Sequence, residues 1–334
     1  MTRVKIIYKA QAWMKPEQCT ELERGGCLFT DDPACRDYDW AVVYDEFPTK
    51  DTGSIRNGRE EPACPAEHTI LVTCEPPSIK IYPRVYTEQF GYVITTHSPR
   101  LLPHPHHVQS KGALWWMANY PLAECFAMPM YEKTRGLATV CSSKQQKHTL
   151  HYARYRLTAE LAKRMPEMDW YGHGVKKLDF KYEALSPYRY HLAVENYIAP
   201  HHWTDKITDP LLAHCLTFYA GDPCLGELLP PESFIPVPLD DPEATYGIIR
   251  SAMENGEYEK RLPAILEARR LIVEHYNFYN QVAEIIHAHQ DAADAAAGNA
   301  ALVSRHALRR TPVGALRSVC SKLHGAWLVK RGIV

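Results

Sequence analysis

The residues of this chain that are best suited to chemistry gather in one short segment, which reads YHLAVENYIAPHHWTDK. Its apolar start has the character of a buried strand, and Glu195 and Asn196 follow directly. Thr204 is a typical helix N-cap, so Asp205 and Lys206 fall in the first helical turn. A helix N-terminus and a lysine favour phosphate, and a short carboxylate can accept hydrogen bonds from a ribose diol. The segment therefore predicts a nucleoside diphosphate site.

The same polar residues also have a purely structural interpretation. An acid at a helix start complements the helix dipole, which would explain Asp205 without a ligand. Lys206 is then a surface charge and Asn196 a turn residue. The pattern of residue types by itself leaves both interpretations open.

The spacing of the segment resembles the donor-domain signature of glycosyltransferase family 10, the fucosyltransferases. That signature is Glu-Asn, eight intervening residues, an acid-Lys pair, an apolar helix, a short strand and a segment like PPESFIPV. The matching residues are Glu195, Asn196, Thr204, Asp205, Lys206, Leu211, Leu212, Pro231, Ser233, Phe234 and Ile235. Upstream the resemblance includes Arg154, Tyr155, Arg156, Leu161 and the run Asp169, Trp170, Tyr171 and Gly172. In the first half it rests on Glu75 in TILVTCEPP and on FGYVITTHSP.

The resemblance implies a GT-B fold, in which two Rossmann-like domains face a cleft and C-terminal helices follow. It implies inverting transfer of L-fucose from GDP-β-L-fucose to a hydroxyl of a glycan acceptor, as in α1,3-fucosyltransferases. By position, Arg154 and Lys206 would hold the pyrophosphate. Asp205 would hold the ribose, and Asn196 would also bind the donor. Glu75 matches the glutamate that the family uses as general base.

Two departures leave the donor sugar open. The family usually carries Glu at the place of Asp205, and this carboxylate is one methylene shorter. Pro210 falls in the segment expected to be helical, so either the first turn is distorted or the main helix starts at Asp209. The alternatives are the same fold with a different GDP-sugar, or a catalytically inactive sugar-binding protein.

Aromatic residues are candidates for lining the donor and acceptor cleft. Trp115 and Trp116 could pack on sugar faces, and core packing is the equal alternative. Trp203, with Glu195 and Thr204, lies in or beside the loop before the expected helix. No Asp-x-Asp motif for a metal–diphosphate bridge stands out, so we expect no metal site and no required cofactor, while a stimulating divalent cation stays open.

Short apolar runs alternate with helix-like segments, which predicts an α/β fold with mostly parallel sheets. The expected strands are residues 4–8, 40–44, 69–73, 92–95, 137–141, 190–194 and 216–219. The expected domains are an acceptor-side domain at 1–132, a GDP-sugar domain at 133–262, a helical segment at 263–300 and a basic tail at 301–334. From Leu271 to His289, apolar and aromatic residues recur at helical spacing and predict one long amphipathic face.

Composition excludes several classes of protein. With 334 residues, 46% of them hydrophobic, and a net charge of −1, the chain reads as a globular protein without overall attraction to nucleic acid. Its ten cysteines form no CxxC pair, so we expect reduced thiols in the cytoplasm. No apolar run approaches the length that spans a bilayer.

The last 34 residues contain seven Lys or Arg and no Asp or Glu. Leu and Trp residues lie among the bases, so this tail fits a helix that lies on an anionic membrane surface. A docked helix with a solvated basic face is equally compatible. The first alternative predicts a peripheral protein at the inner face of the membrane.

Overall fold

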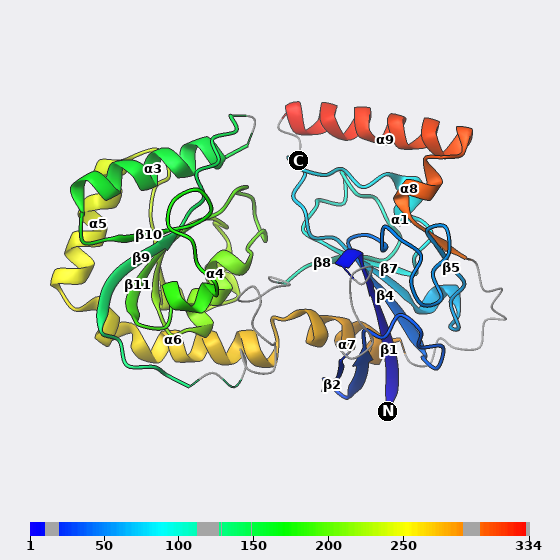
Figure 1. Cartoon of the computed structure of the whole chain (residues 1–334), viewed down its shortest axis with the longest axis horizontal. Coiled ribbons are helices and arrows are strands. Elements are labelled where there is room, and N and C mark those ends of the chain that lie inside the picture. Colours follow the sequence, from blue (N-terminus) through cyan, green and yellow to red (C-terminus); the bar gives the residue numbers. More distant parts are fainter. Residues whose placement is uncertain (11–19, 112–126, 128, 148, 290–300, 332–334) are drawn as a thin grey trace. The chain divides into compact units, whose positions relative to one another are not determined.

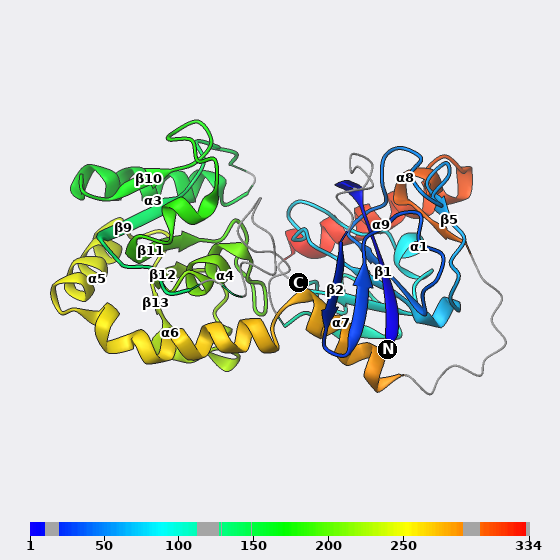
Figure 2. The same cartoon turned by 60° about the horizontal axis from the view of Figure 1, so that its bottom comes forward.

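The computed structural model divides the chain into two compact units. Unit 1 is Met1–Ser110 with Tyr279–Val334, and unit 2 is Lys111–Phe278. The structure describes residues 1–10, 20–111, 127, 129–147, 149–289 and 301–331. Figures 1 and 2 show the helices and strands of each unit.

Unit 1 is built on a seven-stranded sheet with the order β2-β3-β1-β4-β6-β7-β8. All neighbouring strands are parallel except β2 and β3. The strands are β1 (Thr2–Tyr8), β2 (Glu21–Arg24), β3 (Cys27–Thr30), β4 (Trp40–Tyr44), β6 (Thr69–Val72), β7 (Tyr92–Thr95) and β8 (His107–Gln109). The central strands are continuous apolar runs, because a parallel sheet is covered on both faces.

The C-terminal part of the chain also belongs to unit 1. Its elements are α7 (Phe278–Ala288), β14 (Leu302–Val303), α8 (Arg305–Leu308) and α9 (Pro312–Lys330). β14 pairs antiparallel with β5 (Arg59–Glu60), and α9 packs beside α1 (Arg84–Thr87) (Figure 1). Thr311 caps α9 by accepting the backbone N–H of Gly314.

Unit 2 contains a five-stranded sheet, in which every neighbouring pair is parallel. Its strand order is β10-β9-β11-β12-β13. The strands are β9 (Arg135–Val140), β10 (Asp169–Tyr171), β11 (Tyr188–Val194), β12 (Leu216–Ala220) and β13 (Phe234–Pro236). The chain leaves β9 for β10 on one side and then crosses to β11 on the other, so β9 and β11 form a topological switch point.

Helices cover both faces of the unit 2 sheet, with α3 and α6 on opposite sides (Figures 1 and 2). They are α3 (His151–Arg164), α4 (Asp205–Leu212), α5 (Pro242–Glu254) and α6 (Glu257–Glu274). Leu192, Ile207, Phe218 and Ile265 join β11, α4, β12 and α6 in one hydrophobic core. The core fixes where the carboxyl ends of β9 and β11 lie relative to α3 and α4.

The predicted α/β class is confirmed, with two mainly parallel sheets in two Rossmann-like units. That the units face a cleft stays a prediction. The two compact units divide the chain after Ser110 and after Phe278, whereas the expected domains end at residues 132, 262 and 300. The functional division into acceptor-side and GDP-sugar domains stays a prediction. The expected long helical face is two helices, because the chain turns after Glu274 and the Asn277 side chain donates to the carbonyl of Ile272.

The cysteines and the apolarity of the helices can also be compared with the expectations from the sequence. The eight cysteines that the structure describes are free thiols, as expected. Among the described residues, no helix combines the length and apolarity that crossing a bilayer requires.

Candidate functional site

A cavity of about 250 Å³ opens in unit 2 at the switch point between β9 and β11. Open α/β sheets bind ligands at this place, outside the carboxyl ends of the strands. The cavity is lined by Val140, Ser142, Arg154, Lys181, His191, Ala193, Val194, Asp205 and Lys206. Three of the predicted donor residues, on α3 and α4, thus meet at one cavity.

Arg154 is the one cation of the cavity for which the described residues provide no ion pair. It begins the buried stripe of α3, which continues with Leu157, Thr158 and Leu161. This helical spacing turns the guanidinium inward, and only 8% of the residue is exposed. Its Nε is buried without a hydrogen-bond partner in the described part of the chain. A buried, unpaired guanidinium is costly and suits a bound anion.

Lys181 lies between two carboxylates of α4. Its Nζ is 2.6 Å from Asp205 Oδ2 and 2.6 Å from Asp209 Oδ2. Burial lowers the pKa of Lys181, but attraction to the two carboxylates outweighs burial and the net pKa is raised. Burial raises the pKa of Asp209 to about 8 against the attraction of Lys181. For Asp205, attraction to Lys181 and Lys206 outweighs burial and holds the pKa below its usual range.

Glu195 anchors the start of α4. Its side chain is fully buried and Oε1 accepts the backbone N–H of Thr204 at 3.0 Å. The Thr204 hydroxyl donates to both carboxylate oxygens at 3.0 and 2.9 Å. Lys206 Nζ lies 2.9 Å from Thr204 Oγ1 and 3.4 Å from Glu195 Oε2. Glu195 therefore positions the N-cap and the lysine instead of lining the cavity.

The helix α4 begins at Asp205, with Thr204 as its N-cap, and includes Pro210. A helix that starts at Asp209 is therefore excluded. Thr204 Oγ1 accepts the backbone N–H of Lys206 at 3.3 Å, so two N–H groups at this helix start already have partners. Phosphate binding here then depends on side chains more than the sequence pattern suggests.

His191 contributes a neutral side chain to the cavity wall. It lies on β11 with only 3% of its surface exposed, and its Nδ1 has no partner among the described residues. Burial, and next the positive charge of Lys181, lower its pKa to about 3. The imidazole is uncharged near pH 7, so the positive charge of the cavity comes from Arg154, Lys181 and Lys206.

Other predicted site residues lie elsewhere. Asn196 is half-buried in the loop after β11 and does not line the cavity. Trp203 is a correction to the cleft prediction: it is 2% exposed, belongs to the hydrophobic core and packs edge-on against Tyr276. Trp115 and Trp116 lie outside the described residues.

Glu75 lies in unit 1, in the loop after β6, at the carboxyl edge of that sheet. Its backbone is held on both sides: the N–H donates to the Tyr82 hydroxyl at 3.2 Å, and the carbonyl lies 2.9 Å from His97 Nε2. Within the described ranges its carboxylate has no hydrogen-bond partner, while its backbone position is fixed.

Sequence reasoning missed Lys181, His191 and Asp209. Lys181 stands 24 residues before Asp205, and nothing in its surroundings marks a functional residue. His191 and Ala193 stand two residues apart on β11, so both side chains lie on the same face of the sheet. Glu195 continues this spacing, and that pattern is the signal that could have placed His191 near the site. Asp209 follows Asp205 by one helical turn, so a shared partner was detectable.

A second cluster lies on the loops after β11 and β12. The ligand atoms of His201, Cys224 and Glu227 lie within 4.8 Å of one another. Asp222 Oδ1 accepts the backbone N–H of both His201 and Cys224, at 2.9 and 2.8 Å. None of these residues lines the β9–β11 cavity. The expectation that the donor site needs no metal stays a prediction.

No family model matches this chain, and no curated protein sequence matches it. A crystal structure of an alpha1,3-fucosyltransferase is similar at 14% identity, over 85% of this chain and 90% of that chain, with a TM-score of 0.46. A crystal structure of an alpha1,3-fucosyltransferase with GDP-fucose is similar at 15% identity, over 83% of this chain and 92% of that chain, with a TM-score of 0.44.

A sucrose-phosphate synthase from Thermosynechococcus elongatus is similar at 10% identity, over 86% of this chain and 98% of that chain, with a TM-score of 0.39. With TM-scores below 0.5, these likenesses carry no argument about activity.

Proposed function

We propose that the protein is an inverting glycosyltransferase that transfers L-fucose from GDP-β-L-fucose to a hydroxyl of a glycan acceptor. The observation that carries this proposal is the buried, unpaired Arg154 beside Lys181 and Lys206, at the switch point of a parallel sheet. Such a cationic cavity suits the diphosphate of a nucleotide sugar. The match of Glu195, Asn196 and the acid-Lys pair to the fucosyltransferase signature supports the choice of donor.

The cavity can stabilise the leaving group without a metal. When the bond between the anomeric carbon and the β-phosphate oxygen breaks, its electron pair stays on GDP and negative charge grows on the diphosphate. Arg154 would meet that charge, because its guanidinium is not committed to a carboxylate of the described residues. Lys181 and Lys206 are held in place by α4 and Glu195, so they need little reorganisation.

Asp205 is proposed to bind the ribose of the donor. One oxygen, Oδ2, pairs with Lys181, and Oδ1 lies 3.6 Å from Lys206 Nζ. An ionised carboxylate has about four acceptor sites, so hydroxyl donors can still bind. The family's glutamate would reach further, and the shorter side chain favours a different GDP-sugar as the second candidate donor.

Glu75 is proposed as the general base. As the acceptor oxygen attacks the anomeric carbon, Glu75 would take the proton of the acceptor hydroxyl. Support comes from its place at the carboxyl edge of the unit 1 sheet and from its fixed backbone. Asn196, in the loop after β11, is proposed to contact the donor once it is bound.

We also propose that α9 lies on an anionic membrane surface. Its exposed apolar residues, each 49–69% exposed, are Val313, Leu316, Val319, Leu323 and Trp327. The opposite face is buried at Gly314, Ser318, Gly325 and Leu328. A side chain at Gly325 would meet Ile81 at 2.9 Å, so a small residue lets α9 dock closely on unit 1.

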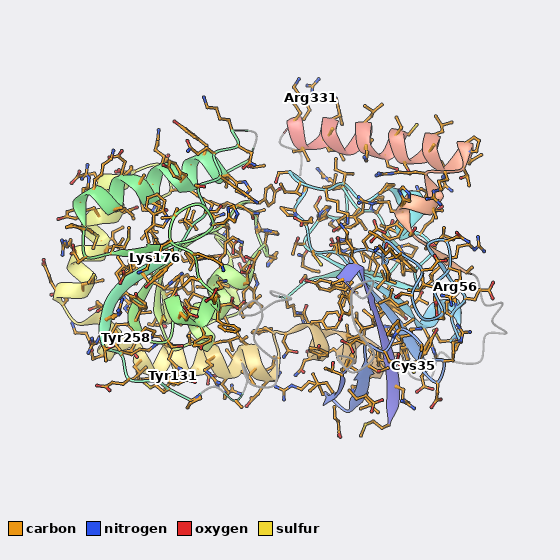
Figure 3. The ribbon with its side chains drawn as sticks, viewed as in Figure 1. Cys35, Arg56, Tyr131, Lys176, Tyr258 and Arg331 are labelled. Carbon is orange, nitrogen blue, oxygen red and sulfur yellow. The ribbon has the colours of Figure 1, made fainter. Side chains whose placement is uncertain are left out.

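The charges of α9 complement an anionic surface. The helix contains no Asp or Glu, and its period places Lys322 and Arg331 on the two flanks of the apolar stripe. Arg331, labelled in Figure 3, stands at the carboxyl end with its guanidinium 5.7 Å from the Trp327 ring. An anionic lipid surface would cover the apolar residues and meet both bases, which supports the proposal of a peripheral protein at the inner face of the membrane.

The test of the enzymatic proposal is GDP release from GDP-fucose in the presence of an array of glycan acceptors. We expect acceptor-dependent release that exceeds release from UDP-sugars, with the mass of one acceptor raised by one fucose. Release from GDP-mannose at a higher rate would assign the second candidate donor. Absence of release and transfer with every GDP-sugar would overturn the proposed activity.

A further inference from the structure

A second cavity, of about 470 Å³, lies within unit 1. It is lined by Lys9, Glu46, Phe47, Pro48, Thr49, Lys50, Asp51, Asn57, Gly58, Ser304, Arg305, His306 and Arg310. All of these residues belong to unit 1, whereas the residues of the proposed donor site belong to unit 2. We call it the β1–β4 cavity.

The β1–β4 cavity occupies the switch point of the unit 1 sheet. The chain passes from β1 to β3 on one side and then crosses to β4 on the other side of β1. Tyr8 pairs with Tyr44 at the carboxyl ends of β1 and β4, and the residues that follow line the cavity, beginning with Lys9 and Glu46. By topology this is where unit 1 would bind a ligand, as we propose for unit 2 at β9 and β11.

The C-terminal segment completes this cavity. The Ser304 N–H donates to the Gly58 carbonyl at 2.7 Å, directly after the pairing of β14 with β5. Gly58 has a φ of +70°, and a Cβ there would lie 2.4 Å from Ser304 Oγ, so a glycine is required. Arg305 Nε then reaches Glu46 Oε2 at 2.9 Å. These contacts bring Arg305 and the bases that follow it to the cavity wall.

Positive charge exceeds negative charge in this cavity. Four side chains that are cationic at neutral pH line it, and the carboxylates of Glu46 and Asp51 oppose them. Glu46 is occupied by Arg305, and Asp51 Oδ1 accepts the Asn57 N–H at 2.7 Å. The four cations are Lys9, Lys50, Arg305 and Arg310. The excess stands out in a chain whose net charge is −1, and it favours an anionic ligand.

We propose that the β1–β4 cavity binds an oxyanion of the acceptor, so that the acceptor is a glycan with a phosphate or carboxylate group. This inference rests on the proposed transferase function, because it assigns the cavity to the acceptor. The donor diphosphate already has a cationic site in unit 2. Binding an acceptor through a group remote from the reacting hydroxyl would orient that hydroxyl, and the binding energy would appear in KM.

The test measures binding of small sugars in the absence of any nucleotide. Glucose 1-phosphate, glucuronate and glucose are titrated into the wild type and into the double variant K9Q/R310Q, with ligand-observed NMR as the readout. Both substituted side chains are exposed, so folding is expected to be kept. Arg100→Gln, an exposed cation of unit 1 outside the cavity, is the matched control.

We expect the two anionic sugars to bind and glucose not to bind. The double variant should bind the anions about tenfold more weakly, whereas R100Q should match the wild type. Comparing glucose 1-phosphate with glucuronate separates a phosphate site from a carboxylate site. Equal binding of glucose, or unchanged anion binding in K9Q/R310Q, would overturn the inference.

Measuring the affinity for GDP distinguishes failure of the proposed anion site in unit 1 from failure of the proposed donor site in unit 2. K9Q/R310Q should bind GDP as the wild type does, because the donor cavity is in unit 2. Anion binding in unit 1 without GDP binding in unit 2 would refute the donor site and keep the anion site. GDP binding without anion binding would refute only the acidic acceptor.

Discussion

Replacing Arg154 should separate ligand binding from stability. A buried cation with a carboxylate partner usually destabilises the fold when it is replaced, since a charge is left unpaired. Arg154 has no such partner in the described part of the chain, and its buried Nε has no hydrogen bond. Arg154→Met keeps most of the apolar stem of the side chain and removes only the guanidinium.

The substitution R154M should weaken GDP binding without lowering the stability of the fold. A buried unsatisfied donor costs about 1–3 kcal/mol, so the free energy of unfolding of R154M without ligand should be unchanged or higher. A hydrogen bond to a charged group contributes about 1.5–3 kcal/mol, so the Kd for GDP should rise about 10- to 150-fold. Urea unfolding measures the first quantity and isothermal titration calorimetry the second.

Arg156 provides the matched control for this experiment. It lies two residues further along α3, where its side chain is exposed and does not line the cavity. Arg156→Met should change neither stability nor GDP affinity. Equal GDP affinity in R154M and the wild type would refute the role assigned to Arg154, and a large loss of stability in R154M would show that the guanidinium has a structural partner.

Four other substitutions test the roles proposed for Glu195, His191, Glu75 and Leu323. Glu195→Gln should lower the free energy of unfolding by about 2–3 kcal/mol and weaken GDP binding, because Thr204 loses its anchor; unchanged urea curves would contradict this. Burial lowers the pKa of His191 from about 6.5 in the unfolded chain to about 3 in the folded protein. The unfolded chain therefore binds a proton more readily, and the free energy of unfolding falls as the pH is lowered from 6.5 toward 3. The loss between pH 7 and pH 5 should be about 2 kcal/mol and should be absent in H191Q, as urea unfolding at both pH values will show. Glu75→Gln should abolish transfer and leave GDP affinity and unfolding unchanged; near-normal transfer would exclude it as the base. Leu323→Asp should reduce co-sedimentation with phosphatidylglycerol vesicles without changing stability, because Leu323 is 68% exposed, and equal sedimentation would argue against membrane docking.

The central strands of both sheets could be predicted from the sequence. The seven expected strands correspond to β1, β4, β6, β7, β9, β11 and β12. Buried apolar residues make up most of β4, β6, β7 and β12, and burial on both faces gives a continuous signal that is easy to read. The short edge strands β8, β10 and β13 have three residues each, too few for a periodic pattern.

The candidate site could be predicted only where its residues follow one another in sequence. Thr204 as N-cap and the acid-Lys pair follow local rules, and the structure keeps them together. Lys181 could not be found, because its contacts with Asp205 and Asp209 depend on how a distant turn packs on α4. Trp203 shows the same limit, since it packs against Tyr276, which follows α6 and is more than 70 residues away in sequence.

The return of the C-terminal segment to unit 1 depends on tertiary contacts. The pairing of β14 with β5 joins residues more than 200 positions apart, and each strand has only two residues. Gly58, whose left-handed backbone admits Ser304, is the local feature on which the pairing depends. A sequence pattern shows such a glycine but not the segment that approaches it.

Calorimetric titration of the wild type and R154M with GDP, GDP-fucose and UDP tests directly whether the β9–β11 cavity is a GDP-sugar site. We expect one binding site in the wild type, a preference for the guanine nucleotides over UDP, and a large loss of affinity in R154M. No binding of GDP at millimolar concentration, or equal affinities for GDP and UDP, would contradict the assignment of the β9–β11 cavity as a GDP-sugar site.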